Sequence, residues 1–328
     1  MNVDPSAQML IALCREAGRR VPMWTQGTGS NASVKAGDRN ELLWIKASGM
    51  RLDQVGGEGG APGIACVQLQ PFLEGAAAIG RAGDPERAYA TLLQSCTVAA
   101  GGLGRPSMES GFHALLPGRW VVHLHSLAAL LMVHDSLRDP QRFWIWWRAA
   151  TPLEARILKA EKPGFELMES IRALPRADLY LLENHGVILQ AEEGAEALAH
   201  WAELERRFLG DWGYAQLLEW SELSAEALRN KVEPGAPLRI FFPDTAVFLD
   251  RLRAALVPAG TRRGEPLWQF RPQAGSVPGE RDVAEIWLAQ QLLLSARADL
   301  AELPEQIAAT VANLPLELFR RGLKDGPG

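Results

Sequence analysis

Near its middle the chain reads Trp120-Val121-Val122-His123-Leu124-His125, the stretch that decides the fold. Its alternation predicts a half-buried β-strand. In a strand the side chains at positions i and i+2 point to the same face, about 6–7 Å apart. Two imidazoles at that separation can bind a single metal ion. The stretch therefore predicts a strand over 120–125 that carries metal ligands on one face.

A third histidine follows in Glu183-Asn184-His185-Gly186. It lies between two apolar runs, 179–182 and 187–189, which places it at the tip of a hairpin-like turn. Three neutral imidazoles around an open position are typical of a catalytic zinc-type site rather than a closed structural one. A lone His-x-His pair is weak evidence, because cupins and amidohydrolases contain it too. Cupins would need a glutamate three or four residues beyond the pair, where this chain has alanines at 128 and 129.

The elements on either side of this strand alternate between helix and strand, which favours a mixed α/β domain. Asp4-Pro5 predicts the start of a helix that Gly18 ends, and Ser126 predicts the N-cap of an apolar helix. Helices are predicted at 5–17, 71–79, 87–98, 105–115, 127–135 and 194–209, with 142–173 mainly helical; strands are predicted at 42–47, 65–69, 120–125 and within the hairpin 179–190.

The character of the sequence changes near residues 210–213. A polar helix is predicted at 221–230 and a proline- and glycine-rich linker at 232–237. A strand at 238–242, a helix at 281–298 and one or two helices within 305–322 would follow. We therefore divide the chain into a catalytic domain, 1–215, and a C-terminal extension, 216–328, in which no motif is assigned.

Composition excludes several classes of protein. The 328 residues are 47% hydrophobic and 22% charged with a formal net charge of −5, and no basic stripe suggests a nucleic-acid partner. The three cysteines are unclustered, which fits a reducing cytoplasm. No apolar run is long enough for a membrane span, and the run at 9–14 is too short for a signal peptide. We expect a cytoplasmic protein with a small-molecule substrate.

Four blocks in order resemble the class II aldolase/adducin family over about residues 5–210. They are Gly27-Thr28-Gly29-Ser30-Asn31-Ala32-Ser33-Val34-Lys35, Ile45-Lys46-Ala47-Ser48-Gly49, Pro106-Ser107-Met108-Glu109 with His113, and the two histidine motifs. The first two look most like the aldolase domain of bifunctional rhamnulose-phosphate aldolase/dehydrogenases. The resemblance implies a three-layer α/β/α domain with a central, mainly antiparallel sheet, to which the C-terminal region would add a smaller α/β extension.

The resemblance also implies the chemistry. His123, His125 and His185 would hold a divalent metal, usually zinc, and Glu109 matches the family's acid/base glutamate. Retro-aldol cleavage of a sugar or sugar-phosphate-like hydroxy-carbonyl compound leaves an enediolate, whose charge a metal can stabilise as a Lewis acid. A carboxylate must then move a proton. The alternative for Glu109 is a first-turn glutamate favoured by the helix dipole.

By the same resemblance, the substrate would be bound by residues in the small-residue loops: Asn31, Lys46, Ser48, Gly49 and Ser107. Such loops offer the amides and hydroxyls that a phosphate or carboxylate needs. Two positions depart from the sugar-phosphate aldolases, because Ser30 stands where glycine is usual and Met108 where a second serine is common. Charge from Lys46, Lys35 or Arg105 could compensate.

Other functions remain open at this point. An epimerase or a decarboxylase would use the same metal site, and an adducin-like interaction module would have no catalysis. A scaffold has no reason to keep three imidazoles and a glutamate, so we favour a metal-dependent aldehyde-lyase. The family and the aromatic cluster at 143–147 predict a homo-oligomer, with a tetramer favoured.

Overall fold

The structure is a computed structural model, and it describes residues 4–57, 63–81, 83–99, 103–220, 235, 238–262, 265–270 and 280–314. Within these ranges no helix is both long enough and apolar enough to span a lipid bilayer. The predicted helix at 221–230 lies outside the described residues, as does most of the predicted linker at 232–237.

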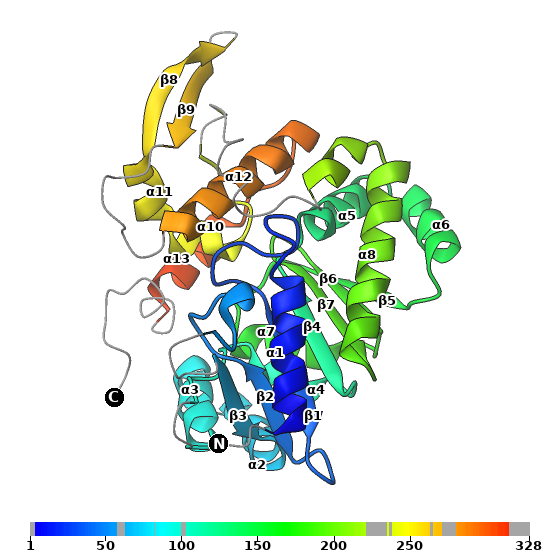
Figure 1. The fold of residues 1–328 in the computed structure, drawn as a ribbon, viewed down its shortest axis with the longest axis vertical. Helices are drawn as coiled ribbons and strands as arrows, with labels where there is room; N and C mark the ends of the chain where they lie inside the picture. The colour runs from blue at the N-terminus through cyan, green and yellow to red at the C-terminus, as the bar shows by residue number, and fades with distance from the viewer. Residues whose placement is uncertain are drawn as a thin grey trace.

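A seven-stranded sheet forms the centre of the molecule (Figure 1). Its order is β3-β2-β1-β4-β7-β6-β5, and every neighbouring pair is antiparallel except β5 and β6. This confirms the mainly antiparallel sheet. The strands are β1 (Asn31–Ala36), β2 (Leu42–Lys46), β3 (Ile64–Gln68), β4 (Trp120–Leu124), β5 (Ala155–Leu158), β6 (Leu179–Leu182) and β7 (Gly186–Ala191).

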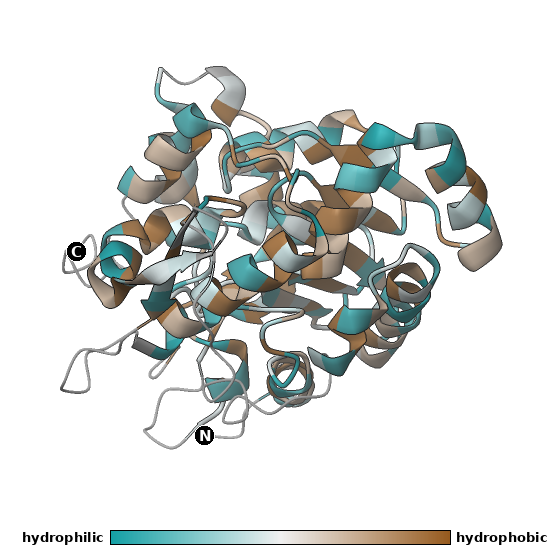
Figure 2. Cartoon of the chain, turned by 90° about the horizontal axis from the view of Figure 1, so that it is seen from above, coloured by the Kyte–Doolittle hydropathy of each residue, from teal (hydrophilic) through white to brown (hydrophobic). Residues whose placement is uncertain are grey.

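Helices cover both faces of the sheet, which confirms the three-layer α/β/α arrangement. The helices on one face are α1 (Pro5–Ala17), α5 (Leu127–Arg138), α6 (Pro140–Ala150) and α8 (Gly194–Asp211), and those on the other are α2 (Leu69–Ala76), α3 (Pro85–Ser95), α4 (Ser110–Leu115) and α7 (Phe165–Ala173). Short 3-10 turns lie at Leu52–Gln54, Ile79–Arg81 and Ala215–Trp220. Figure 2 shows hydrophobic and hydrophilic residues interleaved along the outer helices, as expected where one side of a helix is buried.

The central strand β4 is buried along its whole length rather than on one face. Trp120, Val122 and Leu124 join the large core with α1 and α8, whereas Val121 belongs to the core on the other face. His123 points to that second face, where its ring lies edge-on against Phe112 of α4. The side chains of β4 therefore alternate between the two faces of the sheet as predicted, but helices bury both faces.

Several local predictions are confirmed by capping contacts. The Asp4 carboxylate accepts the Ser6 amide at the start of α1, and Gly18 is its C-cap. The Ser126 hydroxyl accepts the Ala129 amide at the start of α5, directly after the His123–His125 motif. The cap helps to end β4 and begin α5 at a defined residue, and this places His125 just past the end of the strand.

The structure differs from the sequence predictions in three places. The helix expected from residue 105 begins only at Ser110, so Glu109 precedes the helix and is not in its first turn. The segment 142–173 contains β5, a four-residue strand too short to show a period of two. Residues 238–242 are not a strand; the Ile240 carbonyl instead accepts the Leu303 amide.

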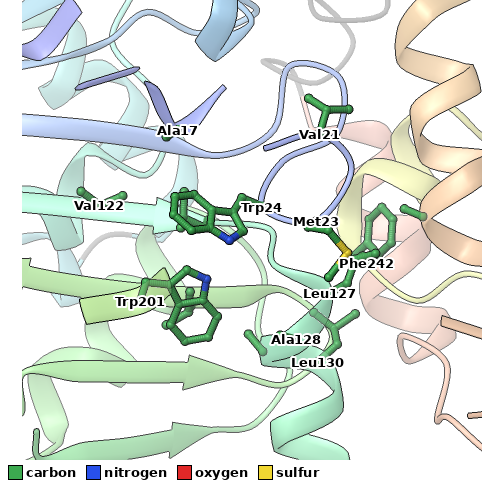
Figure 3. Packing of buried hydrophobic residues seen from close by; sticks show 14 of the residues in the cluster. Ala17, Val21, Met23, Trp24, Val122, Leu127, Ala128, Leu130, Trp201 and Phe242 are labelled. Atoms are coloured by element: carbon green, nitrogen blue, oxygen red, sulfur yellow. The ribbon is translucent and has the colours of Figure 1, made fainter. Parts of the chain in front are cut away.

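The C-terminal region packs against the end of the sheet and is continuous with its core (Figure 1). Phe242 and Trp287 belong to the same buried cluster as Met23 and Leu127, and Figure 3 shows Phe242 beside Met23. The elements of this region are α10 (Pro243–Val247), α11 (Leu249–Ala255), the hairpin β8 (Leu256–Arg262) and β9 (Glu265–Phe270), α12 (Glu280–Ala296) and α13 (Glu305–Asn313). The boundary at 215/216 stays a prediction.

The aromatic cluster on α6 is mostly internal. Phe143 and Trp147 are buried, and Trp146 packs edge-to-face against Phe208 and Trp212 of the same chain. Ile145 is 60% exposed and is the part of this stretch that stays open to solvent. The main effect of the cluster is therefore to stabilise the packing of α6 on α8.

A buried carboxyl lies behind the strand that carries the histidines. Glu205 of α8 accepts the Trp24 indole N–H at 2.6 Å and contacts the Ser126 hydroxyl at 3.5 Å. Figure 3 shows the Trp24 side chain in this buried layer. Burial raises the pKa of Glu205 to about 7, against the lowering effect of these two donors and of Arg20. The folded protein thus binds this proton more tightly than the unfolded chain does.

This raised pKa predicts a pH dependence of stability. The contribution of protonated Glu205 is fully present below the unfolded pKa of about 4.5 and is lost as pH rises through about 7. Glu205→Gln should therefore be more stable than the wild type at pH 8, by about 2–3 kcal/mol. Urea unfolding at several pH values measures this. Glu203→Gln, two positions earlier on α8 and at the surface, is the control, because the pKa of Glu203 is lowered and lies below this window. Equal pH slopes for Glu205→Gln and wild type would contradict the prediction.

Candidate metal centre

The structure brings Glu109, His123, His125 and His185 together in one buried cluster. Each offers a ligand atom, and these atoms lie within 4.8 Å of one another. His123 comes from β4, His125 from the residue after it, His185 from the turn between β6 and β7, and Glu109 from the residue before α4. Gly186 allows this turn to approach β4: it has a φ of +142°, and a Cβ there would collide with the Leu124 carbonyl.

Three of the ligand atoms form a nearly equilateral triangle. The Nε2 atoms of His123 and His185 are 3.3 Å apart, and Glu109 Oε1 is 3.6 Å from the first and 3.3 Å from the second. Ligand atoms around a tetrahedral zinc ion, with bonds of about 2.0–2.1 Å, would be about 3.4 Å apart. The donor set therefore fits one divalent ion.

The protonation and hydrogen bonding of the histidines suit ligation as well. Burial lowers the pKa of His123 to about 4, so its imidazole is neutral at neutral pH. His123 Nδ1 donates to the Val187 carbonyl at 3.0 Å, and this leaves the Nε2 lone pair for an ion. No described residue hydrogen-bonds to the buried atoms Glu109 Oε1 and His125 Nε2. Buried polar atoms that lack a hydrogen-bond partner fit a site in which a bound cation satisfies them.

Asn31 holds the other oxygen of Glu109. It lies on β1 directly opposite His123, and its Nδ2 donates to Glu109 Oε2 at 2.6 Å. Its Oδ1 must then face His113 Nε2, with which it is in contact. His113 Nδ1 in turn lies 2.7 Å from the Ser33 hydroxyl. Burial lowers the pKa of His113 well below its usual value, so the ring is neutral, donates to Asn31 and accepts from Ser33.

This chain of hydrogen bonds orients Glu109. One carboxylate oxygen is fixed by Asn31, and the other is left facing the imidazoles. The Glu109 backbone amide also donates to the Ser107 hydroxyl at 3.2 Å. His113, which accompanies Glu109 in the third block of the resemblance, thus acts on Glu109 through Asn31. The sequence offered no sign of this relay beyond the helical spacing of His113 from Glu109.

A polar cavity opens beside the cluster, and it gathers the residues predicted to bind substrate. It is lined by Thr28, Gly29, Ser30, Asn31, Lys46, Ser48, Gly49, Ser107, Met108, Glu109, His125, Pro163, His185 and Pro243. All five predicted substrate residues are in this lining. Pro243 comes from the C-terminal region, which the sequence had left without a role.

Lys46, Lys35 and Ser30 make contacts that the sequence did not predict. Lys46 Nζ donates to the carbonyls of Thr28 at 2.9 Å and Met50 at 2.7 Å, so it joins two loops of the cavity wall. The Lys35 ammonium instead donates to the carbonyls of Leu116 and Gly118, away from the cavity lining. Ser30 adopts a φ of +61°, and its hydroxyl accepts the His125 amide at 2.9 Å. Ser30 therefore supports the backbone of a candidate ligand.

Comparisons with known proteins identify a family and several similar solved structures. Residues 8–209 match the family described as the class II aldolase and adducin N-terminal domain. No curated protein matches the chain. Among solved structures, the N-terminal class II aldolase domain of a conserved protein from Thermoplasma acidophilum is 22% identical, with 65% of this chain and 96% of that chain covered and a TM-score of 0.49.

Two further solved structures match the chain over most of their own length. An L-fuculose-1-phosphate aldolase from Thermus thermophilus is 20% identical, covering 65% of this chain and 98% of that one, with a TM-score of 0.41. An aldolase II superfamily protein from Pseudomonas syringae is 16% identical and covers 91% of this chain and 97% of that one, with a TM-score of 0.44. The family match spans more than half of the sequence. The chain belongs to the class II aldolase and adducin N-terminal domain family.

Proposed function

We propose that this protein is a metal-dependent aldehyde-lyase, which cleaves or forms a carbon–carbon bond in a small hydroxy-carbonyl compound. The observation that carries the proposal is the triangle of Glu109 Oε1 and the Nε2 atoms of His123 and His185, with edges of 3.3–3.6 Å beside a polar cavity. Zinc is the favoured metal, because imidazole nitrogens and a carboxylate oxygen in a small cluster are its usual ligands.

Each part of the site has a task in this reaction. Backbone amides and hydroxyls of the loops at Ser48-Gly49 and Ser107 would bind the oxygen-rich end of the substrate, and Asn31 would help to orient it. A bound divalent ion would act as a Lewis acid toward the negative charge that develops on the substrate's oxygens. Pro243 and the buried wall would limit the access of water.

Glu109 is proposed to move the proton. Because Asn31 fixes Oε2, the Oε1 atom is the one that faces the reacting centre. In the cleavage direction a carboxylate must accept a proton from a substrate hydroxyl and return one to carbon. The hydrogen bonds from His113 to Asn31 and from Asn31 to Glu109 hold the carboxylate in that orientation. An epimerase or a decarboxylase would use the same residues, so assays must separate the three reactions by product.

The substrate preference forms a separate prediction. Met108 lines the cavity where sugar-phosphate aldolases commonly have a serine, and the Lys46 ammonium is directed to two loop carbonyls. Losing one charge-assisted donor costs about 1.5–3 kcal/mol, or roughly ten- to a hundredfold in affinity. We expect a kcat/KM below about 10⁴ M⁻¹s⁻¹ on fuculose 1-phosphate and rhamnulose 1-phosphate, and better activity on another small hydroxy-carbonyl compound.

Steady-state assays of the zinc-loaded protein test this, with aldehyde release, epimer formation and carbon dioxide followed separately. Met108→Ser restores the missing hydroxyl and should raise kcat/KM on the two phosphates by about tenfold. Met9→Ser is the control, because Met9 is exposed and the variant makes the same chemical change away from the cavity. Met132→Ser would not serve, because Met132 lies in the core. High activity of the wild type on either phosphate would contradict the preference but would support the lyase.

We also propose a cytoplasmic homo-oligomer, with a tetramer favoured. The proposal rests on the family and on the ordinary tendency of enzymes to closed symmetry. The exposed Ile145 and Leu137, at 60% and 50%, lie on neighbouring helices and offer a small apolar surface for such contacts.

A further inference from the structure

The C-terminal region brings a fifth ionisable side chain to the metal centre. Asp244 of α10 is completely buried, and its Oδ2 atom is in direct contact with His125 Nδ1. It is not part of the group of ligand atoms that could hold one ion, which consists of Glu109 and the three histidines. Asp244 therefore contacts the His125 ring from outside the cluster of ligand atoms.

The segment that carries Asp244 is held firmly against the histidines. Asn184, next to His185, donates from Nδ2 to the carbonyls of Phe241 and Ala301, both at 3.0 Å. Phe242 is buried beside Met23 in the main core (Figure 3). The same turn that presents His185 thus anchors residues 241–244, so Asp244 has little freedom to leave His125.

The loop before β1 is fitted to this contact. A Cβ built on Gly29 would lie 2.5 Å from His125 Nδ1 and 2.6 Å from Asp244 Oδ2. Only glycine leaves room for the two side chains to meet there. The loop is held from the other side by α12, where Glu285 Oε2 accepts the Gly27 amide at 2.9 Å and also pairs with Arg51.

The contact has a defined chemical effect. The two atoms are close but are not aligned as a hydrogen bond. A carboxylate oxygen beside a ring nitrogen repels the lone pair of that nitrogen, so Asp244 favours the tautomer of His125 with the proton on Nδ1, and the Nε2 lone pair is then available. His123 reaches the same state through the Val187 carbonyl. A carboxylate behind a ligating histidine also raises its basicity, and removing such a partner typically costs about 10- to 100-fold in metal affinity.

We propose that Asp244 is a positioning residue of the metal centre, which fixes the tautomer and the ring orientation of His125. The C-terminal region thereby contributes a side chain to the site. This proposal rests on the metal centre proposed above. It assigns to residues 241–244 a task that no feature of the C-terminal sequence indicated.

The test measures metal affinity rather than turnover. Asp244→Asn, Gly29→Ala and the wild type are stripped of metal, and zinc affinity is measured by competition with a chromogenic chelator. Cobalt(II) absorption spectra report the geometry at the ion. Asp299→Asn is the matched control, because Asp299 also lies in the C-terminal region and pairs with Arg297 but its side chain is 59% exposed. Circular dichroism and melting of the metal-free proteins verify folding.

We expect Asp244→Asn to bind zinc about 10- to 100-fold more weakly, with a changed cobalt spectrum. Gly29→Ala keeps the carboxylate but separates the pair, so it should show the same loss even if Asp244→Asn folds poorly. Asp299→Asn should stay within about twofold of the wild type. Wild-type affinity and spectrum in either folded variant, with a wild type that binds zinc, would overturn the positioning role alone. A wild type that binds no zinc would instead overturn the proposed metal centre.

Discussion

Replacing Glu109 with glutamine is expected to lower turnover by about a hundredfold or more, the usual scale for a general acid/base. The amide has the same shape, and its oxygen can still accept from Asn31 Nδ2, as Glu109 Oε2 does at 2.6 Å. The group that then faces the imidazoles is an NH₂, which cannot accept a proton. The expected loss is therefore in kcat, measured at saturating substrate with the zinc content verified for each preparation.

The metal should survive this change, although more weakly bound. Three imidazoles remain, but Glu109 Oε1 lies 3.3–3.6 Å from two of their nitrogens and would itself be close to the ion. Glu183→Gln is the matched control, since Glu183 is only two residues from His185 but accepts the Ala160 amide outside the cluster. Turnover of Glu109→Gln within a few-fold of the wild type would assign the proton transfer to another group.

The second large effect is expected from His123→Ala, which should abolish zinc binding. The buried Nε2 atom of His123 forms one corner of the ligand triangle, 3.3 Å from His185 Nε2. Elemental analysis of wild-type protein should find close to one divalent ion per chain after zinc is added. The variant should retain less than about 0.2 ion per chain. Zinc should also raise the melting temperature of the wild type and leave that of the variant unchanged, because only a bound ligand shifts the folding equilibrium.

His200→Ala is the control, because it removes one imidazole from the exposed side of α8. The loss of the hydrogen bond to the Val187 carbonyl is expected to destabilise His123→Ala by about 1–3 kcal/mol. The metal-free forms must therefore be compared by circular dichroism first. A folded His123→Ala that binds zinc as the wild type does would refute the assigned ligand set.

Local signals in the sequence were enough to predict the frame of the site. His123 and His125 lie two apart at the end of β4, and the strand period was enough to predict that their side chains meet. His185 lies between two apolar runs that form β6 and β7. Ser126 caps α5 as its residue type predicts. In each case the interaction is between residues close in the chain, and the side-chain period reveals it.

Contacts between distant segments left no such signal. The helix predicted from residue 105 was wrong at its start, because the bridge of Pro106 to Ala47 keeps this segment extended up to Ser107. β5 was missed because its parallel pairing with β6 is formed across a helix and a loop. The direction of the Lys46 ammonium and the Ser30 hydroxyl also depends on carbonyls and amides that only folding brings near.

The sequence by itself determined the α/β class and the three clustered histidines through its periodicity, whereas the mainly antiparallel sheet and the place of Glu109 followed from the family resemblance that the ordered motifs carry. The tertiary structure alone decided how Glu109 is oriented, through Asn31 and His113, and that Asp244 meets His125. Asp244 lies in a segment with no motif, and its role arises from the packing of α10 against the histidine turn. Such a role depends on which surfaces come together, and a pattern along the chain does not record that.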